Sequence, residues 1–473
     1  MKRTATLAGL CAALVLGLGL AAVGQPPEIC WTAGVTLLCA VWWISEALPI
    51  PVTALVPFAV FPLVGVLTPA EVGQAYGSPL ILLYLGGFML STAMEKSGAH
   101  RRLALGMVNT FGGAGDRGVV FGFMAAAAFL SMWISNTATS LMLLPIALAT
   151  LENVHSRRLK IGLLLGIAYA CNVGGIGTPI GTPPNLIFMQ VYTDTTGIQL
   201  GFVDWMTWGL PVVVIFVPLI ALWVTRGVSR SRNIAVPDVG AWRPEEKRTL
   251  TVFAFTALAW MTRTDPFGGW STWLNLPQAN DASVALLAVL LMFLIPSGKA
   301  RDGKGSRAGG RGSGAGGKGG RLLDWETAIK IPWGILILFA GGICIANAFV
   351  SSGISRIVGE ALGALSTLHP LIVLVVICLS VTFLTEITSN TATTALLMPI
   401  LAAAAIGSGV DPRLLMVPAA MSASCAFMLP VATGPNAVIF ASGHVPIRAM
   451  AGEGLILNLM GAAALSAVCF LLL

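Results

Sequence analysis

Apolar segments long enough to cross a lipid bilayer recur along the whole chain, separated by short polar connections. A helix needs about 20 apolar residues to span roughly 30 Å of hydrocarbon. Two regions, 108–150 and 368–405, each hold two shorter apolar runs that meet at a polar tip. The remaining pattern predicts eleven ordinary crossings, near 4–23, 31–47, 50–67, 79–95, 160–190, 205–225, 249–263, 282–296, 331–350, 413–441 and 452–473.

Composition supports an integral membrane protein, because 56% of the 473 residues are hydrophobic and only 10% are charged. The apolar runs are continuous, whereas the strands of a membrane barrel alternate between apolar and polar positions. We therefore expect an all-α polytopic membrane protein. The four histidines are scattered and the eight cysteines lie in or beside apolar segments without CxxC spacing. This disfavours a membrane metalloprotease, which needs clustered ligands.

The distribution of positive charge predicts the orientation, since Lys and Arg are retained on the cytoplasmic side. With the N-terminus inside, all but three of the 27 basic residues fall on that side, the exceptions being Arg263, Arg356 and Arg413. The C-terminus is then extracytoplasmic, and we expect the plasma (inner) membrane of a bacterium. The net charge of +7 follows from this topology and does not indicate a nucleic-acid partner. Residues 4–23 are longer than the core of a usual secretory signal, which favours a first helix.

Three motifs occur twice in the same order, with nearly the same spacing. The segment SMWISNTATSLMLLPI at 131–146 aligns without a gap with TEITSNTATTALLMPI at 385–400. The other matches are GGFMLSTAMEKSG at 86–98 with GGICIANAFVSSG at 341–353, and GTPPN at 181–185 with ATGPN at 432–436. Such self-similarity indicates an internal duplication. An odd number of predicted crossings, five, separates the copies, so they must be inverted, which is typical of secondary transporters.

The duplication predicts how the chain is divided. We expect a peripheral N-terminal helix at 1–30, a first inverted repeat at 31–235, connecting transmembrane helices at 236–298, a Gly-rich cytoplasmic linker at 299–321, and a second inverted repeat at 322–473. The linker is basic and of low complexity, so its predicted role is that of a flexible tether.

The two polar tips are candidate binding elements. Arg117 precedes the first tip, and Arg157 and Arg158 follow it with charges of the same side, which predicts a re-entrant hairpin. One Ser-Asn-Thr motif alone is more often a packing feature whose hydroxyls bond back to carbonyls. Two copies in an inverted duplication, each followed by a Gly- and Pro-containing break, favour a site that lines a cavity.

The chemistry of these motifs suits a cation together with an anion. Hydroxyl, amide and carbonyl oxygens are ligands for Na⁺, and free N–H groups at helix N-termini attract a carboxylate or a sulfate. Neither motif has a neighbouring Lys or Arg. We therefore expect cation binding to precede and strengthen anion binding, which is a coupling mechanism.

The paired motifs and the C-terminal ASCAFMLPVATGPNAVIF at 423–440 resemble the divalent anion/sodium symporter family over nearly the whole chain. The resemblance implies eleven membrane helices with two re-entrant hairpins, a homodimer formed through a fixed scaffold, and an elevator-like movement of the hairpin-bearing domain. It also implies no enzymatic activity and Na⁺ as the coupling ion. The expected cargo is a small di- or tricarboxylate such as succinate, malate, fumarate or citrate.

The resemblance also implies roles for individual residues. One Na⁺ site would use Ser131, Ser135, Asn136 and Gly181, and its inverted partner Thr385, Thr388, Asn390 and Ala432. The substrate would contact Ser135, Asn136, Thr137, Thr182, Ser389, Asn390, Thr391, Thr433 and Gly434. Relatives often carry proline at the position of Gly434, so the smaller residue predicts a wider pocket.

Other functions within this framework remain open. A Na⁺-independent dicarboxylate exchanger and a Na⁺/sulfate symporter share the expected fold. An ion antiporter of related architecture would need a titratable acid inside the membrane. Glu386 is the one acidic residue close to a Ser-Asn-Thr motif. The alternative for Glu386 is a structural carboxylate paired across the protein.

Overall fold

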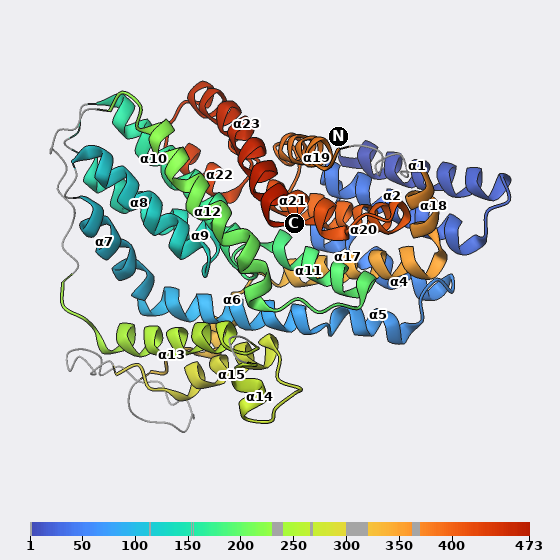
Figure 1. Cartoon of the computed structure of the whole chain (residues 1–473), viewed down its shortest axis with the longest axis horizontal. Coiled ribbons are helices and arrows are strands. Elements are labelled where there is room, and N and C mark those ends of the chain that lie inside the picture. The colour runs from blue at the N-terminus through green and yellow to red at the C-terminus, as the bar shows by residue number, and fades with distance from the viewer. Residues whose placement is uncertain are drawn as a thin grey trace, which may run out of the picture.

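The structure is a computed structural model that describes residues 2–112, 115–152, 154, 156–228, 240–264, 268–298, 320–361 and 369–473. These residues form helices, and an isolated bridge between Pro296 and Arg321 is the only strand-like pairing among them (Figure 1). The predicted all-α class is confirmed. The linker at 299–321 lies outside the described residues except for its last two positions.

The helices follow one another with short connections. The first half of the chain forms α1 (Lys2–Ala22), α2 (Pro27–Ser45), α3 (Ile50–Thr53), α4 (Leu55–Leu63), α5 (Pro69–Tyr76), α6 (Pro79–Ser97), α7 (Ala99–Gly112), α8 (Asp116–Ser131), α9 (Asn136–Thr150), α10 (Arg157–Gly174), α11 (Pro183–Thr196) and α12 (Phe202–Val224). The second half forms α13 (Pro244–Met261), α14 (Gly269–Trp273), α15 (Asp281–Leu294), α16 (Trp325–Ala328), α17 (Trp333–Ser352), α18 (Ile354–Ala361), α19 (Pro370–Thr385), α20 (Asn390–Ser408), α21 (Pro412–Ala423), α22 (Gly434–Ala441) and α23 (Ile447–Leu472).

Within the described part of the chain, eight helical segments are long and apolar enough to cross a membrane. They are α1, α2, α5 with α6, α10 with the following turn, α12, α17, α20 and α23. Shorter apolar helices cover Ile50–Leu63, Asn136–Thr150, Asp281–Leu294 and Pro370–Thr385. A chain with this many apolar helices is a multi-pass membrane protein.

Two segments predicted as single crossings are broken helices. The segment at 160–190 is divided into α10, a 3₁₀ turn at Gly175–Gly177, and α11. The segment at 413–441 is divided into α21 and α22, with an irregular stretch between Ala423 and Gly434. Proline stands in the first turn of the second part of each pair, as Pro183 in α11 and Pro435 in α22, because its fixed φ and missing N–H suit the first turn of a helix but not its interior.

Each predicted hairpin is a pair of helices joined by a four-residue tip. Residues 132–135 connect α8 to α9, and residues 386–389 connect α19 to α20. The first hairpin begins at Asp116, whereas the sequence pattern placed its start at 108. Residues 99–112 instead form α7, which starts directly after Gly98 in a left-handed conformation with φ of 77°. Because basic residues stand early in this helix, its sequence is not apolar enough to be predicted as a crossing.

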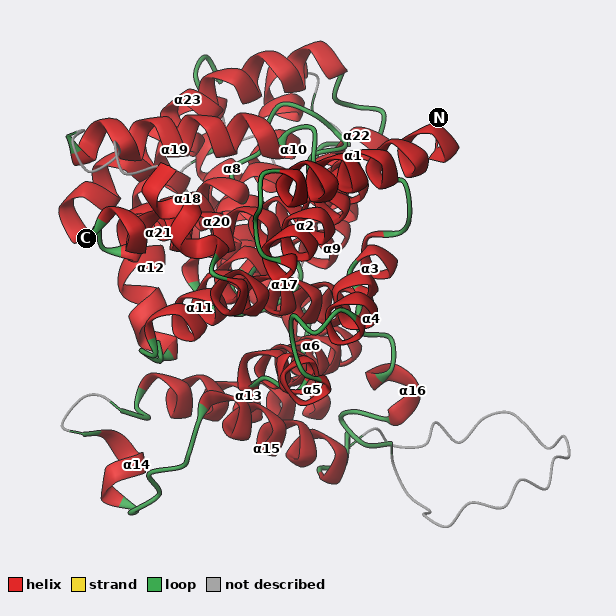
Figure 2. Ribbon diagram, turned by 90° about the vertical axis from the view of Figure 1, so that its right-hand side faces the viewer, coloured by secondary structure: helices red, strands yellow, loops and turns green. Residues whose placement is uncertain are grey.

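The helices α13 and α15 pack on the side of α6 that faces away from the hairpins (Figures 1 and 2). Ion pairs connect α6 and α7 to the helices and loops of this region. The Nζ of Lys96, at the end of α6, lies 2.5 Å from Asp324 just before α16. The hydrogen bonds from Lys96 and Thr327 lower the pKa of Asp324 to about 2. The buried Arg102 of α7 donates to Glu246 of α13 over 2.7 Å.

Candidate functional site

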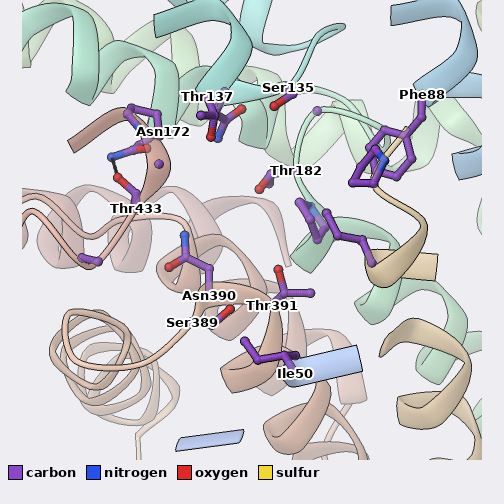
Figure 3. A pocket seen from close by; sticks show the side chains of 18 of the residues that line it. Ile50, Phe88, Ser135, Thr137, Asn172, Thr182, Ser389, Asn390, Thr391 and Thr433 are labelled. Atoms are coloured by element: carbon purple, nitrogen blue, oxygen red, sulfur yellow. Dashed lines mark hydrogen bonds between the residues drawn. The ribbon is translucent and has the colours of Figure 1, made fainter. Parts of the chain in front are cut away.

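A pocket of about 580 Å³ lies where the two hairpin tips meet (Figure 3). Ser135 and Thr137 approach from one side and Ser389, Asn390 and Thr391 from the other. All nine predicted substrate residues line it: Ser135, Asn136, Thr137, Thr182, Ser389, Asn390, Thr391, Thr433 and Gly434. Residues 254 positions apart therefore face one cavity, as the duplicated motifs predict.

The first tip gathers oxygen atoms around Asn136. The Oγ of Ser131 lies 2.5 Å from Asn136 Oδ1 and 2.7 Å from the carbonyl oxygen of Cys171. One hydroxyl proton can serve only one of these two acceptors at a time. Three oxygens crowded in this way, with Ser131 completely buried, form a cluster suited to a small cation.

The second tip repeats the arrangement. The Oγ1 of Thr385 lies 2.7 Å from Asn390 Oδ1 and 3.0 Å from the carbonyl oxygen of Ala423. Ser131 and Thr385 do not line the pocket itself but lie behind the two asparagines. The hydroxyl of Thr388 is engaged with Leu384 and Thr393, within its own hairpin.

Asparagines in the broken helices hold the loops that close each cluster. Asn185 donates to the carbonyl oxygens of Gly175 and Thr178 over 2.9 and 2.7 Å. Asn436 donates to the carbonyl oxygens of Ala426 and Leu429, each over 3.1 Å. These equivalent bonds show that the duplication extends to the geometry of the two sites.

Glycine permits the close approach in the first copy. A Cβ on Gly175 would lie 2.9 Å from Asn136 Oδ1, and one on Gly181 would collide with the carbonyl oxygen of Gly175. The second copy has Ala432 where the first has Gly181, so its loop cannot approach as closely. The two oxygen clusters are therefore similar but not identical.

Four helix N-termini converge on the pocket. The helices α9, α20, α11 and α22 are preceded by Ser135, Ser389, Thr182 and Thr433, and all four residues line the cavity. The side chains of Ser389 and Thr182 do not cap their helices, which leaves N–H groups available to a ligand. Helix N-termini carry a partial positive charge and attract anions. Among the described residues that line the pocket there is no Lys or Arg.

Gly434 does not widen the pocket as its small size predicted. A Cβ at this position would collide with Oγ1 of Thr137 on the opposite repeat. The glycine therefore lets the start of α22 pack directly against α9. The space that a larger residue would occupy is filled by Thr137.

Glu386 is buried in the second tip and bound by four donors. Its Oε1 accepts from the backbone N–H groups of Phe427 and Met428 and from Nδ2 of Asn458, over 2.7, 2.8 and 2.8 Å. Its Oε2 accepts from the backbone N–H of Leu429 over 3.0 Å. This carboxylate holds the loop between α21 and α22, which favours the structural alternative.

Sequence reasoning missed several lining residues. Asn172, near the end of α10, is buried and joins the two repeats. A polar side chain in an otherwise apolar crossing was a usable signal, because such residues usually have a function. Other missed residues lie outside the repeated motifs, namely Glu46, Ile50, Tyr84, Pro332 and Ile335. Phe88 and Trp133 lie within repeated motifs, but as apolar side chains they gave no sign of a binding site.

Comparison with known proteins gives close relatives. The citrate transporter family matches residues 40–416. The chain is 36% identical over 464 residues to a sodium-dependent dicarboxylate transporter, SdcS, of Staphylococcus aureus strain USA300, covering 93% of this chain and 85% of that protein. The SdcS of the bovine strain RF122 / ET3-1 is 37% identical over 459 residues, with coverage of 92% and 84%.

Two solved structures share the fold at low sequence identity. The YdaH transporter of Alcanivorax borkumensis superposes with a TM-score of 0.56 at 16% identity, covering 86% of each chain. MtrF of Neisseria gonorrhoeae superposes with a TM-score of 0.57 at 13% identity, covering 87% of this chain and 83% of that one. The match to the citrate transporter family and the identity to SdcS show that this chain belongs to the divalent anion/sodium symporter family of membrane carriers.

Proposed function

We propose that the protein imports small di- or tricarboxylates such as succinate, malate, fumarate or citrate, driven by Na⁺. The observation that carries the proposal is one pocket with four helix N-termini and two flanking oxygen clusters, but no Lys or Arg among its described lining residues. The name of SdcS, a sodium-dependent dicarboxylate transporter, supports the same cargo and coupling ion.

The site would bind cations and the acid as a unit. The first Na⁺ would bind Ser131, Ser135, Asn136 and the Gly181 backbone, and the second Thr385, Thr388, Asn390 and the Ala432 backbone. A dicarboxylate brings two negative charges, and the helix N-termini supply only partial charges to offset them. Each bound cation therefore increases the affinity for the anion, and the anion increases the affinity for the cation equally.

The pocket opens toward the cytoplasm in this proposal. Its lining includes Glu46, Ile50, Pro332 and Ile335, which lie at the end of α2 and the starts of α3 and α17. These ends are cytoplasmic if the N-terminus is inside and the C-terminus outside, as the basic residues indicate. The structure then corresponds to the state that releases substrate into the cell.

We further propose that the hairpins and broken helices move as one body against a scaffold that forms a homodimer. Contacts across the repeats support one body, among them Asn172 with Thr433 and Gly434 against Thr137. Gly98 and Gly353, with φ of 77° and 81°, end α6 and α17 directly before α7 and α18. Backbone bends at these equivalent positions suit connections between a fixed and a moving part.

Uptake by proteoliposomes tests the proposal. Labelled succinate should accumulate when external Na⁺ exceeds internal Na⁺, and accumulation should stop when choline replaces Na⁺. Undiminished uptake in choline would instead support a Na⁺-independent exchanger. Inhibition by excess sulfate, with uptake of labelled sulfate, would reassign the cargo to sulfate.

A further inference from the structure

The hydroxyl groups of Thr182 and Thr433 occupy equivalent positions in the two repeats but have different surroundings. Each threonine precedes a broken helix and lines the pocket. Thr182 does not cap its helix. Thr433 Oγ1 accepts from the backbone N–H of Asn436 over 3.2 Å and from Nδ2 of Asn172 over 3.1 Å (Figure 3).

Asn172 reaches Thr433 from the other repeat. Its side chain is 1% exposed, and its Nδ2 also lies 3.2 Å from both the carbonyl oxygen of Ala426 and Oδ1 of Asn436. Its own Oδ1 is buried and has no hydrogen-bond partner among the residues that the structure describes. A buried polar atom without a hydrogen-bond partner lowers the stability of the fold. The contacts of Asn172 Nδ2 must therefore offset this loss of stability or serve the function.

Asn172 has no asparagine counterpart in the second repeat. Cys171 and Ala423 accept equivalent hydrogen bonds from Ser131 and Thr385, so the residues that follow them, Asn172 and Ser424, are equivalent. Serine carries a hydroxyl and no side-chain amide, so Ser424 cannot provide the N–H donor that Asn172 provides. The orientation of a threonine by an asparagine therefore occurs once in the duplicated site, at Thr433.

We propose that Asn172 is a positioning residue that fixes Thr433 as a hydrogen-bond donor to the substrate carboxylate. A hydroxyl has one proton and two acceptor lone pairs. Asn436 and Asn172 occupy both lone pairs of Thr433, so the proton points away from them and is available to the pocket that Thr433 lines. This inference rests on the proposed import of carboxylates.

A double-mutant cycle in proteoliposomes tests the assignment. Thr433→Val should raise the KM for succinate roughly tenfold or more, since a hydrogen bond to a charged group is lost. Asn172→Ser, which introduces the residue of the other repeat, should raise KM roughly threefold to tenfold by freeing the hydroxyl. In the Thr433→Val background, Asn172→Ser should have no further effect on KM.

Matched variants separate positioning from loss of structure. Thr433→Ser keeps the hydroxyl and should raise KM much less than Thr433→Val, and Asn172→Ser should still raise KM in the Thr433→Ser background. Ser424→Ala changes the equivalent buried residue and should leave KM unchanged. If Asn172→Ser does not fold, Asn172→Asp has the same shape but accepts instead of donating, and its effect on KM should also shrink in the Thr433→Val background.

Two outcomes would overturn the inference. Additive effects of the two substitutions on KM would show that Asn172 does not act through Thr433. An unchanged KM with a raised Na⁺ requirement would show that Asn172 supports the loop at Ala426 instead. If the wild-type protein transports none of the carboxylates, the proposed function fails, whereas wild-type transport with an unaffected Asn172 variant contradicts only this inference.

Discussion

At the scale of single residues, the site is built from oxygen atoms whose positions are fixed by neighbouring backbone. Ser131 and Thr385 illustrate this, because each hydroxyl lies between an asparagine side chain and a carbonyl oxygen. The two copies use different hydroxyl residues for the same task. The hydroxyl, and not the methyl group of threonine, is therefore what the two copies share.

Removing either hydroxyl should weaken Na⁺ binding. Ser131→Ala and Thr385→Ala should each raise the Na⁺ concentration for half-maximal uptake roughly fivefold, as expected for about 1 kcal/mol from one lost polar contact. Thr385→Ser keeps the oxygen and serves as the control. A Na⁺ dependence that stays unchanged in both alanine variants would remove these residues from the cation sites.

Glu386 should prove structural. At present the Glu386 carboxylate accepts hydrogen bonds from backbone N–H groups of the loop at 427–429. In Glu386→Gln the amide NH₂ would replace one accepting oxygen and face an N–H donor, so the loop loses about 1–3 kcal/mol of stabilisation. We expect a lower melting temperature with residual Na⁺-dependent uptake, and loss of uptake in Asn136→Ala. If Glu386→Gln abolished transport while Asn136→Ala did not, an ion antiporter would be the better account.

Gly434 should not tolerate a side chain. Gly434→Ala places a methyl group against Thr137 and should separate the two repeats at the pocket, which lowers succinate affinity. Gly106→Ala on α7 is the matched control, because no atom in the described part of the chain lies within 4 Å of the new methyl group there. Wild-type affinity in Gly434→Ala would show that the contact with Thr137 adapts.

At the scale of elements, the sequence predicted the positions of the polar tips and of the proline-containing breaks. It did not predict the short helices α7 and α18. The tips at 132–135 and 386–389 carry a repeated motif, and GTPPN and ATGPN mark the two breaks with proline. The short helices α7 and α18 have no such signal. Their lengths fall below that of a crossing, so hydropathy alone does not distinguish them from loops.

Gly98 and Gly353, which directly precede α7 and α18, should be sensitive to substitution. Gly353→Ala forces a Cβ into a left-handed conformation and should cost about 1–2 kcal/mol of stability. The backbone alone accounts for this cost, because no atom of the described residues lies within 4 Å of the new methyl group. Gly98→Ala should cost more, because the new methyl group also displaces Arg243. Thermal unfolding in detergent measures both, and a Gly353→Ala protein as stable as the wild type would contradict the strain argument.

At the scale of the whole molecule, the polar motifs allowed the meeting of distant residues to be predicted, because an inverted duplication places both motifs around one centre. The apolar part of the pocket could not be predicted. Ile50 and Ile335 come from helices whose sequences resemble any other apolar crossing. Their place in the site depends on packing between elements far apart in the chain.

Movement of the hairpin-bearing body can be tested at its contact with α6. The hydroxyl of Ser78, before α6, donates to Gln190 of α11. In a Ser78→Cys/Gln190→Cys variant, a short thiol cross-linker should hold the present arrangement and stop uptake, and a reducible linker should restore it on cleavage. Each single cysteine variant is the control, and full transport by the cross-linked protein would show that the two helices do not move apart.

The most direct test of the central claim, that cations and the carboxylate bind together at the two hairpin tips, is the affinity for succinate as a function of Na⁺ concentration. Calorimetry on the purified protein, with choline keeping the ionic strength constant, gives this affinity. Joint binding predicts that the Kd for succinate falls as Na⁺ rises, and that Asn136→Ala or Asn390→Ala weakens this dependence. A Kd that is the same in Na⁺ and in choline would contradict it.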